Sequence, residues 1–200
     1  MFLKAYEVIK INDRKAISKY KKQLKDYPLS IYLTYHDYRM HMSNTPEKQI
    51  KAFIKNNRDS YLSDKLYGHW LKHLAGKKHW TTFLKNYKPQ KSQDLQCYYI
   101  QALANRKQLS KALELAKPIW QSSTGLSKAC KPVDILIRNN KKLTGTMIWH
   151  RINLAMNKKK LKLAKKLSKD LSAKEKKMFD YWLKVYKLSL IHISEPTRPL

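Results

Sequence analysis

Apolar residues recur along this chain at i, i+3, i+4 and i+7, the spacing that places them on one face of an α-helix, almost from end to end. Only 4 of the 200 residues are glycine, which argues against a turn-rich β-sandwich or barrel. The sequence therefore predicts an all-α chain. Four stripes show the pattern most clearly: Leu62–Leu74, Leu95–Leu103, Leu109–Trp120 and Met178–Tyr186.

The helical pattern is broken at short intervals, which predicts many helices of about 10–16 residues with short connections. The predicted breaks lie near 27–28, 43–46, 56–59, 76, 88–92, 105–108, 122–127 and 139–145. Thr45 and Pro46 are predicted as an N-cap and first helical residue, and Ser172 with Glu175 as a capping box. The predicted fold is a superhelix of stacked antiparallel helix pairs, a TPR-like solenoid without a fixed sequence repeat.

The charge of the chain is strongly unbalanced, with 43 Lys and Arg against 14 Asp and Glu, a formal net charge of +29. Such a field favours an anionic partner: nucleic acid, anionic lipid or a cell-wall polymer. Ten lysines fall between Lys158 and Lys177, interleaved with Leu and Ala rather than with aromatic residues. That segment is predicted to be one amphipathic helix with a solvated basic face. No apolar run is long enough to predict a transmembrane segment.

One histidine cluster has the spacing of a zinc protease. His69, His73, Gly76 and His79 follow the H-x-x-x-H-x-x-G-x-x-H pattern of metzincins. Trp70 occupies the position of the general base, and an indole cannot accept a proton as a carboxylate does. We therefore predict no metal site here, but three histidines on a basic helical hairpin.

The acidic residues do not form a catalytic pair. Glu114 falls off the apolar stripe of its helix, and Asp26 and Asp134 have the character of surface or capping residues. No Ser-His-Asp arrangement or glycine-rich phosphate loop is found in the sequence. The chain is predicted to contain no catalytic residue, to bind no cofactor and to have no muramidase activity of its own.

The two cysteines, Cys97 and Cys130, are 33 positions apart and belong to no C-x-x-C motif. From the residues alone, a disulfide and two unpaired thiols remain equally open.

Several segments, taken together and in order, resemble the soluble lytic murein transglycosylases. Residues 26–35 resemble the D-Y-P-L-x-P-Y-L-x-Y segment of that family, with Ile31 in place of its second proline. The similarity extends over 2–167. The further matching segments are Phe53–Asn57, Trp70–Ala75, Trp80–Tyr87, Gln96–Tyr99, Ala129–Cys130 and Trp149–Ala155. The matched positions expected to have a structural role are Asp26, Tyr27, Pro28, Leu29, Tyr32, Tyr35, Trp70, Trp80, Trp149 and Arg151.

The resemblance implies a periplasmic protein with a U-shaped α-superhelical region, followed by a lysozyme-like domain. That domain cleaves the bond between N-acetylmuramic acid and N-acetylglucosamine in peptidoglycan, and its Glu-Ser and Gly-Leu-Met-Gln motifs are not in this sequence. This chain is therefore expected to be the non-catalytic part, with peptidoglycan glycan strands as its partner and nucleic acid not expected. The resemblance also implies a disulfide between Cys97 and Cys130, formed in the oxidising periplasm.

Both ends of the chain lead us to expect a fragment. Met1–Lys4 are not followed by the pattern of a signal peptide, which we expect has been lost by truncation. Leu188–Arg198 is similar to one reading frame of a sequencing adapter. The expected division is a superhelical domain over 1–187 and a non-native tail over 188–200.

Two other functions remain open. A basic helical-repeat protein that binds nucleic acid through phosphate contacts is the main alternative, and a scaffold for peptide partners is the third. Nucleic-acid binding would weaken steeply with salt, because counterions are released.

Overall fold

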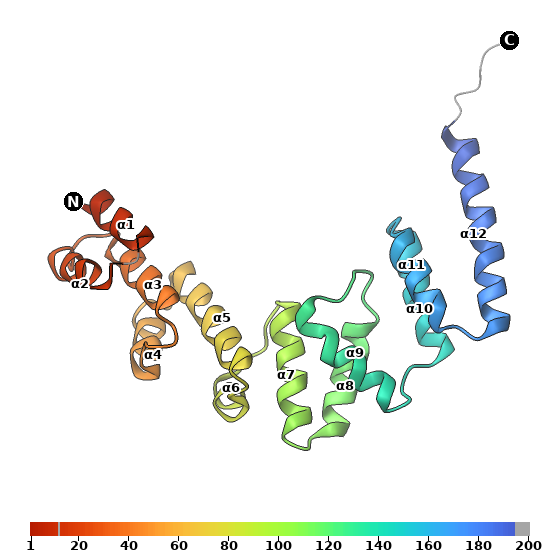
Figure 1. Cartoon of the computed structure of the whole chain (residues 1–200), viewed down its shortest axis with the longest axis horizontal. Helices are drawn as coiled ribbons and strands as arrows, with labels where there is room; N and C mark the ends of the chain where they lie inside the picture. Colours follow the sequence, from red (N-terminus) through yellow and green to blue (C-terminus); the bar gives the residue numbers. More distant parts are fainter. Residues whose placement is uncertain (12, 195–200) are drawn as a thin grey trace, which may run out of the picture. The chain divides into compact units, whose positions relative to one another are not determined.

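The computed structural model describes residues 1–11 and 13–194, and within these ranges the chain contains helices and no strand (Figure 1). The predicted all-α fold is therefore confirmed. The chain divides into two compact units, the first ending at Lys107 and the second beginning at Gln108.

The described residues of the first unit form seven helices, in which each odd-numbered helix contacts the next odd-numbered one. Helix α1 packs on α3, α3 on α5 and α5 on α7, while α2, α4 and α6 also contact odd-numbered helices. This is the contact pattern of stacked helical hairpins, in which each pair buries its apolar stripe against its neighbours. The helices are α1 (Phe2–Lys10), α2 (Arg14–Gln23), α3 (Ser30–Met40), α4 (Glu47–Asn56), α5 (Tyr61–Gly76), α6 (Trp80–Asn86) and α7 (Gln93–Asn105).

Two apolar clusters hold the first unit together. One joins α1, α2 and α3 through Ala5, Ile17 and Leu33. The other runs from α3 to α7 and is centred on α5 and α6, where Leu66, Leu71 and Phe83 have no solvent exposure. The predicted stripe Leu62–Leu74 is thus the buried face of α5.

The second unit contains five α-helices and two short 3-10 helices among the described residues. Helix α8 packs on α9, and α10 packs on α11 and on η2. Its core includes Trp120, Ile137 and Ile152, all fully buried. The elements are α8 (Leu109–Trp120), η1 (Lys128–Cys130), α9 (Lys131–Asn139), α10 (Gly145–Asn157), α11 (Leu161–Leu167), η2 (Ser168–Asp170) and α12 (Ala173–Ser194). Among the described helices, none is both long and apolar enough to cross a membrane.

Two of the predicted helix starts can be compared with the structure. The Ser172–Glu175 capping box is confirmed, since the Ser172 amide donates to Glu175 Oε2 at 3.0 Å and the Glu175 amide donates to Ser172 Oγ at 3.4 Å. The prediction for Thr45 and Pro46 is wrong by one residue. Pro46 has extended backbone and is the N-cap of α4, and the Thr45 hydroxyl instead donates to the His41 carbonyl at 2.8 Å.

The prediction of one helix over Lys158–Lys177 is also wrong. Helix α10 ends at Asn157, and α11, η2 and α12 follow as separate elements. The chain turns after α10 because the Lys159 and Lys160 amides donate back to the Met156 and Ala155 carbonyls, both at 2.8 Å. Helix α12 continues to Ser194, past the expected tail boundary at 187/188, and residues 195–200 of that tail lie outside the described residues.

Lysine takes the place of glycine at four helix ends. Lys78, Lys107, Lys141 and Lys159 have positive φ angles of 52–60°, the left-handed conformation that glycine adopts most easily. At Lys78, Lys141 and Lys159, a pair of amides donates back to the last helical turn in the Schellman arrangement. The scarcity of glycine thus has a structural cost, since an L-residue in this conformation is disfavoured by roughly 1–2 kcal/mol.

We predict that Lys159→Gly stabilises the second unit by about 0.5–1 kcal/mol, the left-handed strain relieved less the added entropy of the unfolded chain. The matched control is Lys158→Gly, one residue earlier, where φ is −92° and glycine brings only its entropic penalty. Urea denaturation followed by circular dichroism measures both variants. A loss of stability in Lys159→Gly equal to that of Lys158→Gly would contradict the strained turn.

Candidate functional site

The three histidines with protease-like spacing lie on α5 and at the start of α6. His69 and His73 belong to α5, and His79 is the N-cap of α6. Burial lowers the pKa values of His69 and His73, and the positive charges of Arg39 beside His69 and Lys77 beside His73 lower them further. In the described part of the chain, no group of three or more His, Cys, Asp or Glu side chains is placed to hold a metal ion.

A basic groove of about 1080 Å³ lies in the first unit, between α4, α5 and the loop 87–92. We call it the unit-1 groove. Tyr67 and Trp70 of α5 contribute its aromatic lining, Ser63, Asn86 and Gln90 contribute polar groups, and Asp64 is the acidic residue in its lining. Its cationic residues are Lys51, Lys55, Arg58, Lys85, Lys88 and Lys91, all exposed.

The hydroxyl of Tyr67 holds the loop at the edge of the groove. It donates to the Asn86 carbonyl and accepts from the Lys88 amide at 3.0 Å. Burial raises the pKa of Tyr67, which keeps the hydroxyl protonated and able to donate. Farther along the loop, Gln96 Nε2 donates to the Gln90 carbonyl at 2.6 Å. The loop lysines are therefore carried on anchored backbone.

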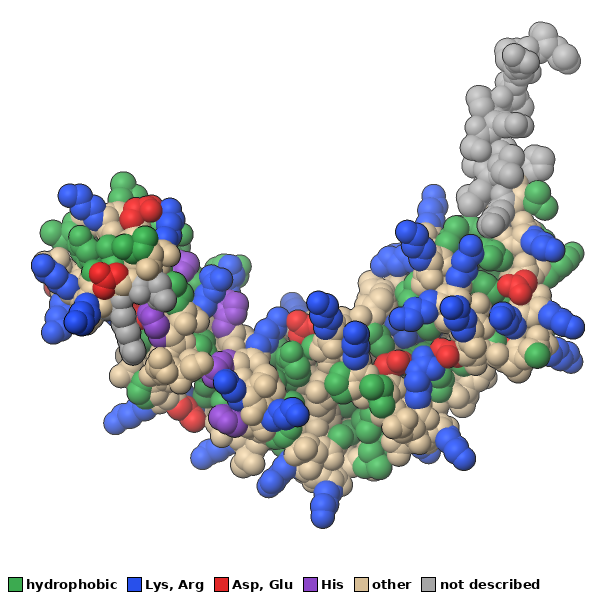
Figure 2. All heavy atoms as spheres, in the orientation of Figure 1, with side chains coloured by type: hydrophobic (Ala, Val, Ile, Leu, Met, Phe, Trp, Pro, Cys, Tyr) green, Lys and Arg blue, Asp and Glu red, His purple; other side chains and the backbone are tan. Residues whose placement is uncertain are grey.

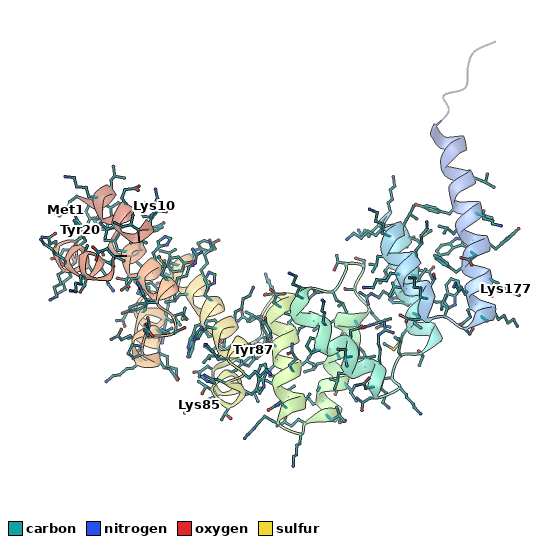
Figure 3. The ribbon with its side chains drawn as sticks, viewed as in Figure 1. Met1, Lys10, Tyr20, Lys85, Tyr87 and Lys177 are labelled. Atoms are coloured by element: carbon teal, nitrogen blue, oxygen red, sulfur yellow. The ribbon has the colours of Figure 1, made fainter. Side chains whose placement is uncertain are left out.

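Tyr87 ties the end of α6 to α7. Its ring stacks on that of Tyr99 at 4.2 Å between centroids and on that of Phe83 at 5.4 Å. Figure 3 shows Tyr87 where the chain leaves α6 toward α7, with Lys85 nearby at the end of α6. The aromatic stack fixes the position from which the loop 87–92 begins.

The second unit contains a cavity of about 580 Å³, which we call the unit-2 cavity. Gly125, Leu126, Leu163 and Leu167 form its apolar lining. Its charged lining consists of six cationic and two acidic residues: Lys131, Arg138, Arg151, Lys162, Lys166, Lys169, Asp134 and Asp170.

A polar network crosses one wall of this cavity. Trp120 Nε1 donates to Asp134 Oδ1 at 2.7 Å, and Arg138 Nε donates to Asp134 Oδ2 at 3.1 Å. The two terminal nitrogens of Arg138 donate to the two oxygens of Asp170, each at 2.8 Å. The hydrogen bonds to Asp170 and then to Asp134 raise the pKa of Arg138 above its ordinary value. Asp134 is therefore a part-buried network residue and not the surface or capping residue that the sequence predicted.

Arg151 lies against this network and is only 3% exposed. Its guanidinium carbon is 4.6 Å from the centroid of the Trp120 ring, and its Nη2 donates to the Thr124 carbonyl at 3.2 Å. Its Nε is buried without a hydrogen-bond partner. Burial lowers the pKa of Arg151, and the charge of Asp134 partly opposes this.

Basic side chains are spread over both units on the face drawn in Figure 2, and acidic ones are sparse there. The charge is evident from the sequence, but neither hollow is, because each is lined by residues from helices and loops far apart in the chain.

Comparisons with known proteins point to one family. No protein-family model matches the chain. The soluble lytic murein transglycosylase of Escherichia coli K12 is 29% identical over 135 residues, which is 66% of this chain and 21% of the relative; that of Salmonella typhimurium LT2 is 28% identical over the same length. The chain is a distant homologue of these enzymes. The matched stretch spans about a fifth of the relatives, in their N-terminal region.

Solved structures of such enzymes share the fold of this homologue. The 70 kDa soluble lytic transglycosylase of Escherichia coli matches with a TM-score of 0.80 at 22% identity, over 93% of this chain and 30% of that one. The transglycosylase Slt of Pseudomonas aeruginosa, in an inactive mutant form, matches with a TM-score of 0.78 at 23% identity, over 86% and 28% of the two chains. The likeness confirms the predicted superhelical fold class, and the catalytic domain of these enzymes is not covered.

The residues of this homologue that carried the resemblance have different environments. Tyr35 and Trp70 are buried in the core of the first unit, and Trp80 packs against that core. Trp149 lies 6.4 Å and 6.3 Å, between ring centroids, from Phe179 and Trp182 of α12. Arg151 lines the unit-2 cavity, whereas Asp26, Tyr27, Pro28, Leu29 and Tyr32 are exposed between α2 and the first turn of α3. Cys97 and Cys130 are each fully buried, one in each unit, and their disulfide stays a prediction.

Tyr67→Phe should destabilise the first unit by about 1 kcal/mol, because the Asn86 carbonyl and the Lys88 amide both lose the hydroxyl that pairs them. Chemical denaturation measures the loss. Tyr61→Phe is the matched control, since the Tyr61 side chain is 68% exposed, and it should leave stability unchanged. Equal effects in the two variants would show that Tyr67 does not anchor the loop.

We predict that the bridge between Cys97 and Cys130 stabilises the oxidised protein by about 3–4 kcal/mol, from the entropy of the 33-residue loop that it closes. Reductant should lower the melting temperature, and Cys97→Ser should show the same lower value with no further effect of reductant. Mass spectrometry after alkylation provides the direct test. Alkylation of both thiols without prior reduction would exclude the bridge.

Proposed function

We propose that residues 1–187 form the non-catalytic helical part of a periplasmic lytic transglycosylase, and that the unit-1 groove binds peptidoglycan glycan strands. The observation that carries the proposal is the distant homology to soluble lytic murein transglycosylases, supported by the basic groove with its aromatic lining.

The groove has the chemistry that an anionic glycan requires. Its exposed lysines and Arg58 attract the carboxylates of the polymer, and their field raises its local concentration. Polar groups such as Ser63 and Gln90 suit sugar hydroxyls, and the half-buried Tyr67 offers an apolar edge for a sugar ring. Because the loop 87–92 is anchored through Tyr67 and Gln96, little ordering entropy is lost when it binds.

The proposed role of the chain is to bind and position, not to cleave. In the family, a lysozyme-like domain cleaves the bond between N-acetylmuramic acid and N-acetylglucosamine. Holding a strand near such a domain raises its effective concentration there. The exposed Glu114 has neither the burial nor the partners of a general acid, so we expect no strand cleavage by this chain alone.

The proposal predicts that Lys85→Gln, Lys88→Gln and Lys91→Gln together weaken binding to purified soluble glycan strands by about tenfold, at roughly 0.2–1 kcal/mol for each exposed charge. The matched control replaces Lys15, Lys107 and Lys111, which lie outside the groove, and should retain binding. Calorimetry at 50 and 150 mM salt measures both triple variants.

Binding of duplex DNA and of single-stranded RNA, measured at the same two salt concentrations, distinguishes the nucleic-acid alternative from the glycan proposal. Tighter binding of either one than of the glycan at 150 mM salt, lost in the groove variant, would replace the peptidoglycan proposal. Equal loss of glycan binding in the groove and control variants would show that net charge, not the groove, causes the attraction.

A further inference from the structure

Arg151 is an unusual residue for a core. The residue is only 3% exposed, yet no carboxylate of the described chain lies within ion-pair distance of it. Its contacts are the Trp120 ring and a single carbonyl, and its Nε is buried without a partner. A buried cation with so few compensating contacts is costly, and a further anionic group could reach it through the cavity that Arg151 lines.

The charges of Asp134 and Asp170 offset only part of this cost, because neither carboxylate forms an ion pair with Arg151. Both oxygens of Asp170 accept from Arg138, and the oxygens of Asp134 accept from Arg138 and Trp120. Four exposed lysines remain, Lys131, Lys162, Lys166 and Lys169, and among the described side chains none of them forms an ion pair. The cavity therefore has cationic groups in excess, one of them buried.

The lining is also apolar enough to favour a ligand that has an aliphatic part. Leu126 and Leu163 are half-buried and Leu167 is buried, and all three line the cavity together with Gly125. A small inorganic anion would leave this apolar surface in water. An aliphatic carboxylate would cover it while its charged end meets the lysines and Arg151.

We propose that the unit-2 cavity is a binding site for an aliphatic carboxylate, with Arg151 and the lysines of α11 and η2 as its cationic groups. The carboxylate can come from a free dicarboxylic acid or from the acidic stem peptide of peptidoglycan, and the chemistry of recognition is the same for both. All residues of this site belong to the second unit, so it is a different site from the glycan groove proposed in the first.

The full chain, titrated with glutarate at constant ionic strength, tests the site. Saturable binding is expected by calorimetry, together with a shift of the Arg151 Nε–H signal in ¹H–¹⁵N spectra. Glutaramide, which has the same carbon chain without charge, and inorganic phosphate, which lacks the aliphatic body, should bind at least tenfold more weakly.

Two variants locate the binding. Lys162→Gln, Lys166→Gln and Lys169→Gln together should weaken glutarate binding by about tenfold. The matched control replaces Lys158, Lys165 and Lys174, exposed lysines of the same region outside the cavity lining, and should bind as the parent chain does. Arg151→Lys should also weaken binding; if this variant does not fold, the comparison of the two lysine variants decides the proposal.

Absence of saturable glutarate binding, equal binding of phosphate, or equal loss in both lysine variants would overturn the site. Muropeptides with and without their stem peptides identify the source: preference for the peptide-bearing form assigns the site to peptidoglycan, and glutarate binding alone assigns it to a free acid. Glutarate binding that survives in the Lys85, Lys88 and Lys91 variant keeps this proposal separate from that of the groove.

Discussion

The structure depends on the burial of one apolar stripe by each short helix. Most of the helices have between 7 and 16 residues, close to or below the length at which an isolated helix is stable in water. Each one is therefore stable only while its stripe is covered by neighbours. In the first unit each odd-numbered helix, from α1 to α7, packs against the next odd-numbered one and covers part of its apolar stripe. Phe83 is an example of complete burial, since it lies on a seven-residue helix and has no solvent exposure. The sites on both units are built on this framework.

Much of the fold could be predicted because the same stripes decide both local structure and packing. The interruptions near 56–59, 88–92 and 105–108 coincide with real ends of helices. The largest miss occurred where lysine hides the signal. Lysine is a good helix former, so the run after Asn157 predicted a continuous helix, although Lys159 adopts the left-handed turn usually marked by glycine. A turn made by an unfavourable residue is set by the packing on either side of it, which a local pattern does not contain.

The candidate sites were less predictable, because they depend on residues that only the tertiary fold brings together. Trp120, Asp134, Arg151 and Asp170 come from four different elements. Their sequence neighbours indicate only which helix face each occupies. Arg151 was marked by its resemblance to a family position, but the reason for a buried arginine emerges from its contacts with Trp120 and Thr124. Asp134 was predicted to be a surface or capping residue, but its carboxylate accepts from the indole nitrogen of Trp120, a contact that only the tertiary fold creates.

The positive charge links the fold to the proposed functions. A formal charge of +29 repels itself in a folded chain, and exposed ion pairs such as Lys51–Glu47 offset little of that repulsion. The basic residues that line the unit-1 groove and the unit-2 cavity concentrate the repulsion locally. An anionic ligand in the groove or in the cavity would reduce this repulsion. The reduction is larger in the folded state than in the unfolded chain, because folding holds the lysines close together. Binding and stability are then linked: the ligand raises the free energy of unfolding in proportion to the logarithm of its concentration above the dissociation constant.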